Sequence, residues 1–131
     1  MTLTISRTAL NEIRRAAAAD DVEICGLLLG RGGDVERVVP CANIAPDPQH
    51  AFEIDPAALV TAYRAARAGG PLVIGHYHSH PGGDASPSAR DAAGAEEGSY
   101  WIIAGATELR CWQALGGGKF ADVRVVACDN R

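Results

Sequence analysis

His76-Tyr77-His78-Ser79-His80-Pro81 is the stretch that decides how this chain is organised. The run just before it, residues 71–75, is short, apolar and partly β-branched, which predicts a buried strand that leads into the histidines. Side chains two residues apart on a strand point to the same face, so we expect His78 and His80 to lie side by side. Two neutral imidazoles in this arrangement are a common beginning of a transition-metal site.

Ser88-Ala89-Arg90-Asp91 follows the histidines and predicts the start of a helix. Ser88 is typical of an N-cap, and Asp91 comes three residues later, where its carboxylate can bond a free backbone amide. On spacing alone this capping interpretation of Asp91 is favoured, because caps are far commoner than metal sites. The other interpretation makes Asp91 a third ligand, since two histidines and one carboxylate leave a tetrahedral zinc with an open fourth position.

Three histidines alternate within five residues, at positions 76, 78 and 80. A lone histidine is usually a satisfied structural residue. Three neighbouring histidines would repel one another when charged, so they are costly to gather without something to coordinate. The residues alone therefore favour a metal site over a purely structural cluster.

Length and composition limit the other possibilities. A chain of 131 residues suits one domain with a single core, so we expect one domain over residues 1–131. Apolar residues make up 47% and charged residues 21%, which is ordinary for a soluble globular protein. The net charge of −4 gives no electrostatic footprint for nucleic acid, and no apolar run is long enough to cross a bilayer. We therefore expect neither nucleic acid nor a membrane as a partner.

The four cysteines are widely spaced and contain no Cys-x-x-Cys pair. This spacing disfavours structural zinc clusters and thioredoxin-like motifs, and it favours free thiols in a reducing compartment. The N-terminus also lacks the basic and then apolar pattern of a secretory signal. The expected location is therefore the cytoplasm.

The hydrophobic pattern predicts strands with interspersed helices. Strands are expected near residues 3–5, 23–30, 35–39, 50–54, 71–80, 100–104, 109–113 and 120–126, and helices near 7–19, 56–68 and 88–97. The helix over 56–68 is expected to bury Leu59, Val60, Tyr63 and Ala66. Glu23 stands at the entrance of a buried strand, and taken alone it is best interpreted as an exposed strand-edge charge. The order of elements predicts an α/β (α+β) fold, with a curved mixed β-sheet sandwiched by helices.

These residues together resemble the JAMM (MPN+) metalloprotease motif: His78-x-His80-Pro, then Ser88, then Asp91, with Glu23-x-Cys-Gly-Leu-Leu-Leu-Gly upstream. The resemblance covers nearly the whole chain and implies a compact prokaryotic member with a cytidine-deaminase-like JAMM (MPN) domain. It implies one Zn²⁺ per chain, with His78, His80 and Asp91 as metal ligands. It also implies that Glu23 is the general base and that Ser88 helps to stabilise the oxyanion. These implications overturn the two simpler interpretations of Glu23 and Asp91.

His76 departs from the family pattern, in which relatives usually carry an apolar or aromatic residue. It is expected on the same strand face as the two ligand histidines. A buried core or supporting histidine is favoured over a ligand, although zinc sites with three histidines exist. His50 has no place in the motif, and we expect it at the surface.

The resemblance also implies a substrate class. Larger eukaryotic members cut isopeptide bonds to remove ubiquitin, whereas compact prokaryotic members act on ubiquitin-like β-grasp proteins, including sulfur carriers that end in Gly-Gly. We therefore expect zinc-dependent hydrolysis of a peptide or isopeptide bond at the C-terminus of such a protein, including release of cysteine from a sulfur carrier. An extended diglycine tail would suit a groove beside a sheet edge. The oligomeric state stays open, with a homodimer as one option.

Two functions of other classes compete with this one. A non-catalytic MPN scaffold is disfavoured by the complete set of ligands. A zinc peptidase that acts on cell-wall or other small peptides is disfavoured because no fused wall-hydrolase domain or secretion signal is evident.

Overall fold

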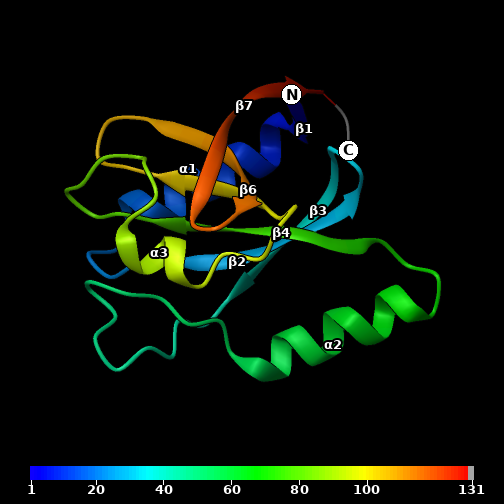
Figure 1. Ribbon diagram of the computed structural model, residues 1–131, viewed down its shortest axis with the longest axis horizontal. Helices are drawn as coiled ribbons and strands as arrows, with labels where there is room; N and C mark the ends of the chain where they lie inside the picture. Colours follow the sequence, from blue (N-terminus) through cyan, green and yellow to red (C-terminus); the bar gives the residue numbers. More distant parts are fainter. Residues whose placement is uncertain (130–131) are drawn as a thin grey trace.

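The strands of the computed structural model, which describes residues 1–129, form one closed mixed sheet in the order β1-β3-β2-β4-β5-β6-β7 (Figure 1). The elements are β1 Thr2–Ser6, α1 Arg7–Ala18, β2 Cys25–Arg31, β3 Asp34–Cys41, α2 Pro56–Arg67, β4 Leu72–Ser79, α3 Ala89–Ala93, β5 Tyr100–Ala104, β6 Leu109–Gly116 and β7 Lys119–Cys128. β1–β7 and β4–β5 are parallel, whereas β2 pairs with both β3 and β4 in the antiparallel sense. The expected α+β fold with a mixed sheet is confirmed. The closure through β1 and β7 was not predicted.

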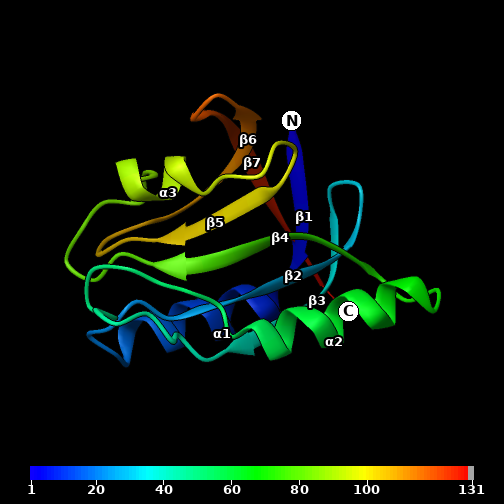
Figure 2. The same ribbon diagram turned by 60° about the horizontal axis from the view of Figure 1, so that its bottom comes forward.

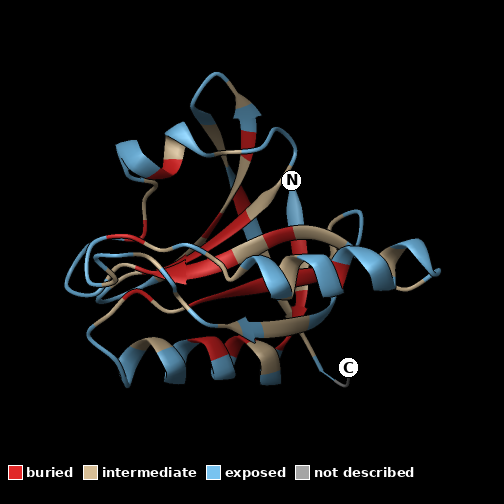
Figure 3. Cartoon of the chain, turned by 90° about the horizontal axis from the view of Figure 1, so that it is seen from below, coloured by how far each residue is buried: buried red, intermediate tan, exposed pale blue. Residues whose placement is uncertain are grey.

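Helices lie on both faces of the sheet around β4. On α1, Leu10 and Ile13 are buried in the same cluster as Tyr77 of β4. On the opposite face, Ala62 of α2 packs against Leu27 of β2. The buried strand residues, red in Figure 3, lie between α1 and α3. Because side chains alternate along β4, the residues on either side of Tyr77 point away from α1, toward the face of α2 and α3.

β4 and β5 run side by side and end on the same side of the molecule (Figure 2). The pairing continues one residue beyond β4, because the N–H of His80 donates to the carbonyl of Ala104 over 2.9 Å. The turn that follows brings the chain back to α3, with Gly82 in the left-handed region at φ 71°. The end of β4 and the start of α3 are thereby brought together.

Three local predictions were wrong. Residues 50–54 form no strand, and only an isolated bridge pairs Asn43 with Ile54. Helix α3 ends at Ala93, because Gly94 and the turn after it interrupt the helical hydrogen bonds. On α2, Val60 and Tyr63 are 49% and 43% exposed, since the helix touches the sheet along a narrower stripe than its sequence predicts.

The structure also bears on membrane-spanning helices and on the cysteines. Within residues 1–129, no helix combines the length and apolar character needed to cross a membrane. All four cysteines are free: Cys25, Cys41, Cys111 and Cys128.

Candidate metal centre

Three side chains converge where the end of β4 meets α3: His78 on β4, His80 just after it and Asp91 on α3. Nε2 of His78 lies 3.1 Å from Nε2 of His80, and these two nitrogens lie 3.3 Å and 3.1 Å from Oδ2 of Asp91. A tetrahedral zinc with bonds of about 2.0–2.1 Å has edges of about 3.3–3.4 Å between its ligand atoms. Only one proton can sit between the two facing Nε2 atoms of His78 and His80. The triangle formed by these nitrogens and Oδ2 of Asp91 therefore suits a bound cation better than a network of hydrogen bonds.

The orientation of His80 is fixed from its other nitrogen. Nδ1 lies 2.9 Å from the backbone oxygen of Asp84, so Nδ1–H donates to that carbonyl and the lone pair of Nε2 points into the cluster. His78 is held by packing instead. Its ring is fully buried and stacks on Phe52 with a centroid distance of 4.2 Å, and its Nδ1 has no hydrogen-bond partner among the described residues.

The charges of the three groups follow from their surroundings. Burial lowers the pKa of His78 and outweighs the opposing hydrogen bond with Asp91, so His78 favours the neutral form. Burial also tends to lower the pKa of His80, but hydrogen bonds to Asp91 and the Asp84 carbonyl raise it overall. For Asp91, burial alone would raise the pKa, yet the hydrogen bonds from the two imidazoles hold it well below its usual range. An ionised carboxylate beside a neutral imidazole is a donor set for a divalent cation.

Glu23 lies beside this cluster, just before β2, and is only 7% exposed. Its carboxylate and one nitrogen each of His78 and His80 lie within 4.8 Å of one another. Burial raises the pKa of Glu23, and His80 opposes this effect. No hydrogen bond joins its carboxylate to another residue within 1–129, so its oxygens are available to an incoming group. The interpretation of Glu23 as an exposed edge charge is wrong.

Ser88 and Asp91 form a capping box at the start of α3. The Asp91 N–H donates to Oγ of Ser88 over 3.0 Å, and the Ser88 N–H donates to Oδ2 of Asp91 over 2.9 Å. The Ser88 hydroxyl accepts in this contact and keeps its own proton to donate. Ser88 itself is exposed, so that proton can reach a bound ligand.

His76 points to the same face but stands apart from the convergent atoms. Its half-buried ring packs edge-on against Trp101 with a centroid distance of 4.2 Å, and its Nε2 has no partner in the described chain. It does not belong to the cluster formed by Glu23, His78 and His80. His50 is exposed as expected, with Nδ1 3.0 Å from a carboxylate oxygen of Asp47.

Hollows open on both sides of the cluster. One of ≈ 290 Å³ reaches Asp91 and shares His76 and Trp101 with a neighbouring hollow of ≈ 550 Å³ that runs over β4 beside α2. A third, of ≈ 730 Å³, reaches His80 from the other side. β4 is hydrogen-bonded to β2 and β5 along both edges, so β4 itself offers no free strand edge to a diglycine tail.

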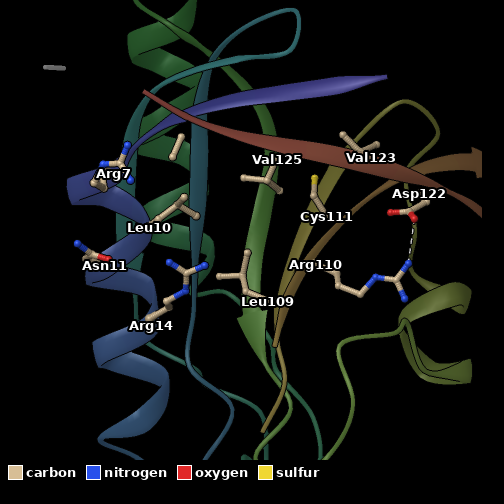
Figure 4. A pocket seen from close by; sticks show the side chains of 11 residues that line it. Arg7, Leu10, Asn11, Arg14, Leu109, Arg110, Cys111, Asp122, Val123 and Val125 are labelled. Carbon is tan, nitrogen blue, oxygen red and sulfur yellow. Dashed lines mark hydrogen bonds and ion pairs between the residues drawn. The ribbon is translucent and has the colours of Figure 1, made fainter. Parts of the chain in front are cut away.

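A separate hollow of ≈ 530 Å³ lies between α1 and the strands β6 and β7 (Figure 4). None of the five predicted site residues lines it. Arg110 at its rim is already paired with Asp122 over 2.9 Å, and Arg7 is paired with Asp129 over 3.2 Å. It therefore shows no link to the cluster of histidines and acids.

Two contributors to the site were not found from the sequence: Phe52, which stacks on His78, and the backbone oxygen of Asp84, which orients His80. Phe52 had a weak signal, because it is an aromatic residue in a short apolar run. A backbone carbonyl leaves no periodic pattern in the sequence. Their roles depend on contacts between segments that are distant in the sequence.

Known proteins resemble the chain over most of its length. A protein named desampylase from Haloferax volcanii is 40% identical over 86 residues, which cover 63% of this chain and 61% of that protein. The chain therefore spans less than two thirds of that relative. A Thermus thermophilus protein, named "Probable TtuB-protein conjugate cleaving protease", is 37% identical over 116 residues, which cover 86% of this chain and 76% of that protein.

The fold has solved counterparts. A solution structure of a protein from Desulfitobacterium hafniense matches with a TM-score of 0.82 and 29% identity, and the match covers 98% of this chain and 94% of that one. The profile of the prokaryotic homologues of the JAB domain matches residues 6–115. The chain therefore belongs to the family of prokaryotic JAB domain homologues, the compact JAMM (MPN+) type that its motif resembles.

Proposed function

We propose that this protein is a zinc-dependent hydrolase that cleaves a peptide or isopeptide bond at the C-terminus of a ubiquitin-like protein ending in Gly-Gly. The observation that carries the proposal is the approach of His78, His80 and Asp91 to within 3.3 Å of one another, beside Glu23. The names of the two relatives, a desampylase and a conjugate-cleaving protease, support the substrate class. Release of cysteine from a sulfur carrier is the finer form of this proposal.

The proposed roles follow from the positions of the side chains. His78, His80 and Asp91 would hold one zinc per chain, which when bound polarises the scissile carbonyl and lowers the pKa of water to about 7. Glu23 takes the proton of the attacking water and delivers it to the leaving amine. The Ser88 hydroxyl donates to the developing oxyanion.

The proposed chemistry needs a single copy of the chain. All five residues lie in one chain, so a homodimer, if it forms, adds nothing that these steps require. We assign the reaction to the cytoplasm, in keeping with the free thiols.

The test is intact-mass spectrometry with two substrates. One is a β-grasp carrier extended by one cysteine after Gly-Gly, and the other is the same carrier joined by an isopeptide bond to a lysine peptide. Zinc-loaded wild type is expected to trim at least one of them back to Gly-Gly, while Glu23→Gln trims neither. Loss of mass from the first substrate alone assigns the amino-acid-releasing form. No trimming of either by protein with bound zinc would overturn the proposed substrate class.

A further inference from the structure

Asn43 lies outside the five-residue site, in the irregular connection between β3 and α2, yet every polar atom of its side chain is used. The amide nitrogen donates to the carbonyl of Glu23 over 2.8 Å and to the carbonyl of Ala51 over 2.9 Å. The amide oxygen accepts the N–H groups of Ala45 and Glu53, each over 3.0 Å. An asparagine side chain has two donor hydrogens and two acceptor lone pairs, so this set is complete. If the amide were flipped, its NH2 group would face the N–H groups of Ala45 and Glu53, and its oxygen would face two carbonyl oxygens. These contacts therefore fix the orientation of the Asn43 amide.

The main chain of Glu23 depends on this connection. Its N–H donates to the carbonyl of Pro48 over 2.7 Å, and its own carbonyl accepts from Asn43. Glu23 precedes β2, so neither group belongs to the hydrogen-bond ladder of the sheet. The position of Glu23 is therefore set from the connection, while the next residue, Ile24, is tied to Ser79 at the end of β4.

The other bonds of Asn43 hold the part of the connection that covers the cluster. Ala51 and Glu53, which it binds, flank Phe52. The ring of Phe52 stacks on His78. The Asn43 side chain thus binds both the main chain of Glu23 and the residues on either side of Phe52, whose ring covers His78.

We propose that Asn43 is a positioning residue for the hydrolysis, which keeps the Glu23 carboxylate beside His78 and His80 by holding the main chain of Glu23. This inference rests on the proposed function and on the proposed role of Glu23. The hydrogen bonds of the Asn43 side chain go to backbone groups of Glu23 and of residues 45–53, and not to the side chains of the proposed ligands. Without the donor to its carbonyl, the main chain of Glu23 keeps only one of its own two hydrogen bonds, the one to Pro48. A displacement of about 1 Å in a reacting group can cost on the order of a hundredfold in rate.

The test variant is Asn43→Asp, which keeps the acceptor oxygen but turns an oxygen toward the carbonyls of Glu23 and Ala51. We expect kcat to fall on the order of tenfold to a hundredfold with a smaller change in KM, because the proposed effect is on the position of the base. Zinc content is expected to match wild type, since the proposed ligands lie at the end of β4 and on α3, and none of them bonds to Asn43. Asn11→Asp makes the same chemical change on the exposed face of α1, and Ser6→Ala removes the side-chain cap of α1. Both are expected to keep wild-type kcat.

A double-mutant cycle separates positioning from a general structural role. If Asn43 acts through Glu23, then adding Asn43→Asp to Glu23→Gln lowers the residual rate little further. A merely structural role lowers the rate by the same factor in both backgrounds, and this result would overturn the proposal.

A crystal structure of zinc-loaded Asn43→Asp gives an answer that does not depend on any substrate, so it stands even if the proposed function fails. The proposal expects the Glu23 carboxylate to move away from His80 while His78, His80 and Asp91 keep their mutual distances. A Glu23 carboxylate in its wild-type place would contradict it. If Asn43→Asp does not fold, Asn43→Ala serves both tests, because the space it leaves relieves the contact between oxygens.

Discussion

Asp91 and Ser88 bond each other in both directions, and the Oδ2 of Asp91 that accepts from the Ser88 backbone is also the atom nearest to both imidazoles. Helix α3 has only five residues, so it has little helical structure of its own to orient Asp91. The capping box supplies that orientation. The cap and ligand interpretations of Asp91 are therefore compatible, because one carboxylate oxygen can serve the helix and face the histidines together.

Asp91→Ala is expected to abolish zinc binding, because the two histidines alone lose the anionic member of the set. The expected result is a metal content near zero after gel filtration, measured by elemental mass spectrometry. Asp122→Ala is the control, since Asp122 is an exposed acid paired with Arg110 on β6. Wild-type zinc content in Asp91→Ala would rule out Asp91 as a ligand.

Ser88→Ala tests the roles of the Ser88 hydroxyl while leaving the three proposed metal ligands in place. The free energy of unfolding is expected to fall by about 1 kcal/mol through loss of the N-cap. The rate is expected to fall on the order of a hundredfold through loss of an oxyanion donor, with zinc retained. Denaturant titration and steady-state kinetics measure the two effects. Ser86→Ala, two residues earlier, is the control, and equal kcat in both variants would contradict the oxyanion role.

Glu23→Gln tests the proposed base. Glutamine keeps the size and shape of the side chain but cannot take a proton, so turnover is expected to fall to a small residual rate while zinc remains bound. Single-turnover cleavage and metal analysis on the same sample check the two parts together. Activity near that of wild type would show that another group takes the proton.

Part of the cluster could be predicted from local information, whereas the roles of Asp91 and Glu23 beside the histidines came from the resemblance to the JAMM family. Alternation placed His78 and His80 on one face, and a three-residue spacing placed Asp91 on the first turn of a helix. The partners of β1 could not be predicted in this way, because alternation tells which side chains face the core and not which strands pair. The false strand at 50–54 has a related cause: Phe52 is apolar because it covers His78, and the backbone on either side of it bonds to Asn43 instead of to a strand.

Gly75→Ala is expected to destabilise the protein and to weaken zinc binding with it. A Cβ at Gly75 would meet the main-chain oxygen of Tyr100 on β5, so the two paired strands would have to separate. Overpacking of this kind costs about 1–3 kcal/mol, and a backbone obstacle belongs at the upper end. Gly94→Ala is the matched control, because it has φ −102° and no atom within 4 Å of the added carbon. Equal denaturation midpoints for the two variants would contradict the argument.

The buried thiols predict a loss of stability in alkali. Burial raises the pKa of Cys25 and of Cys111 from 9.0 to about 12. Above pH 9 the unfolded chain therefore releases thiol protons that the folded chain keeps, and the free energy of unfolding falls as pH rises. Each such thiol contributes a slope that approaches about 1.4 kcal/mol per pH unit.

Cys111→Ala tests this slope at one of the two thiols. Urea unfolding of the zinc-free protein, compared at about pH 8 and about pH 10, is expected to show a smaller alkaline loss in the variant by roughly 1 kcal/mol. Removing zinc keeps the pH dependence of metal binding out of the comparison. The cost of the substitution itself is present at both pH values and cancels in the difference. Equal alkaline losses in the two proteins would show that Cys111 ionises alike in the folded and unfolded chains.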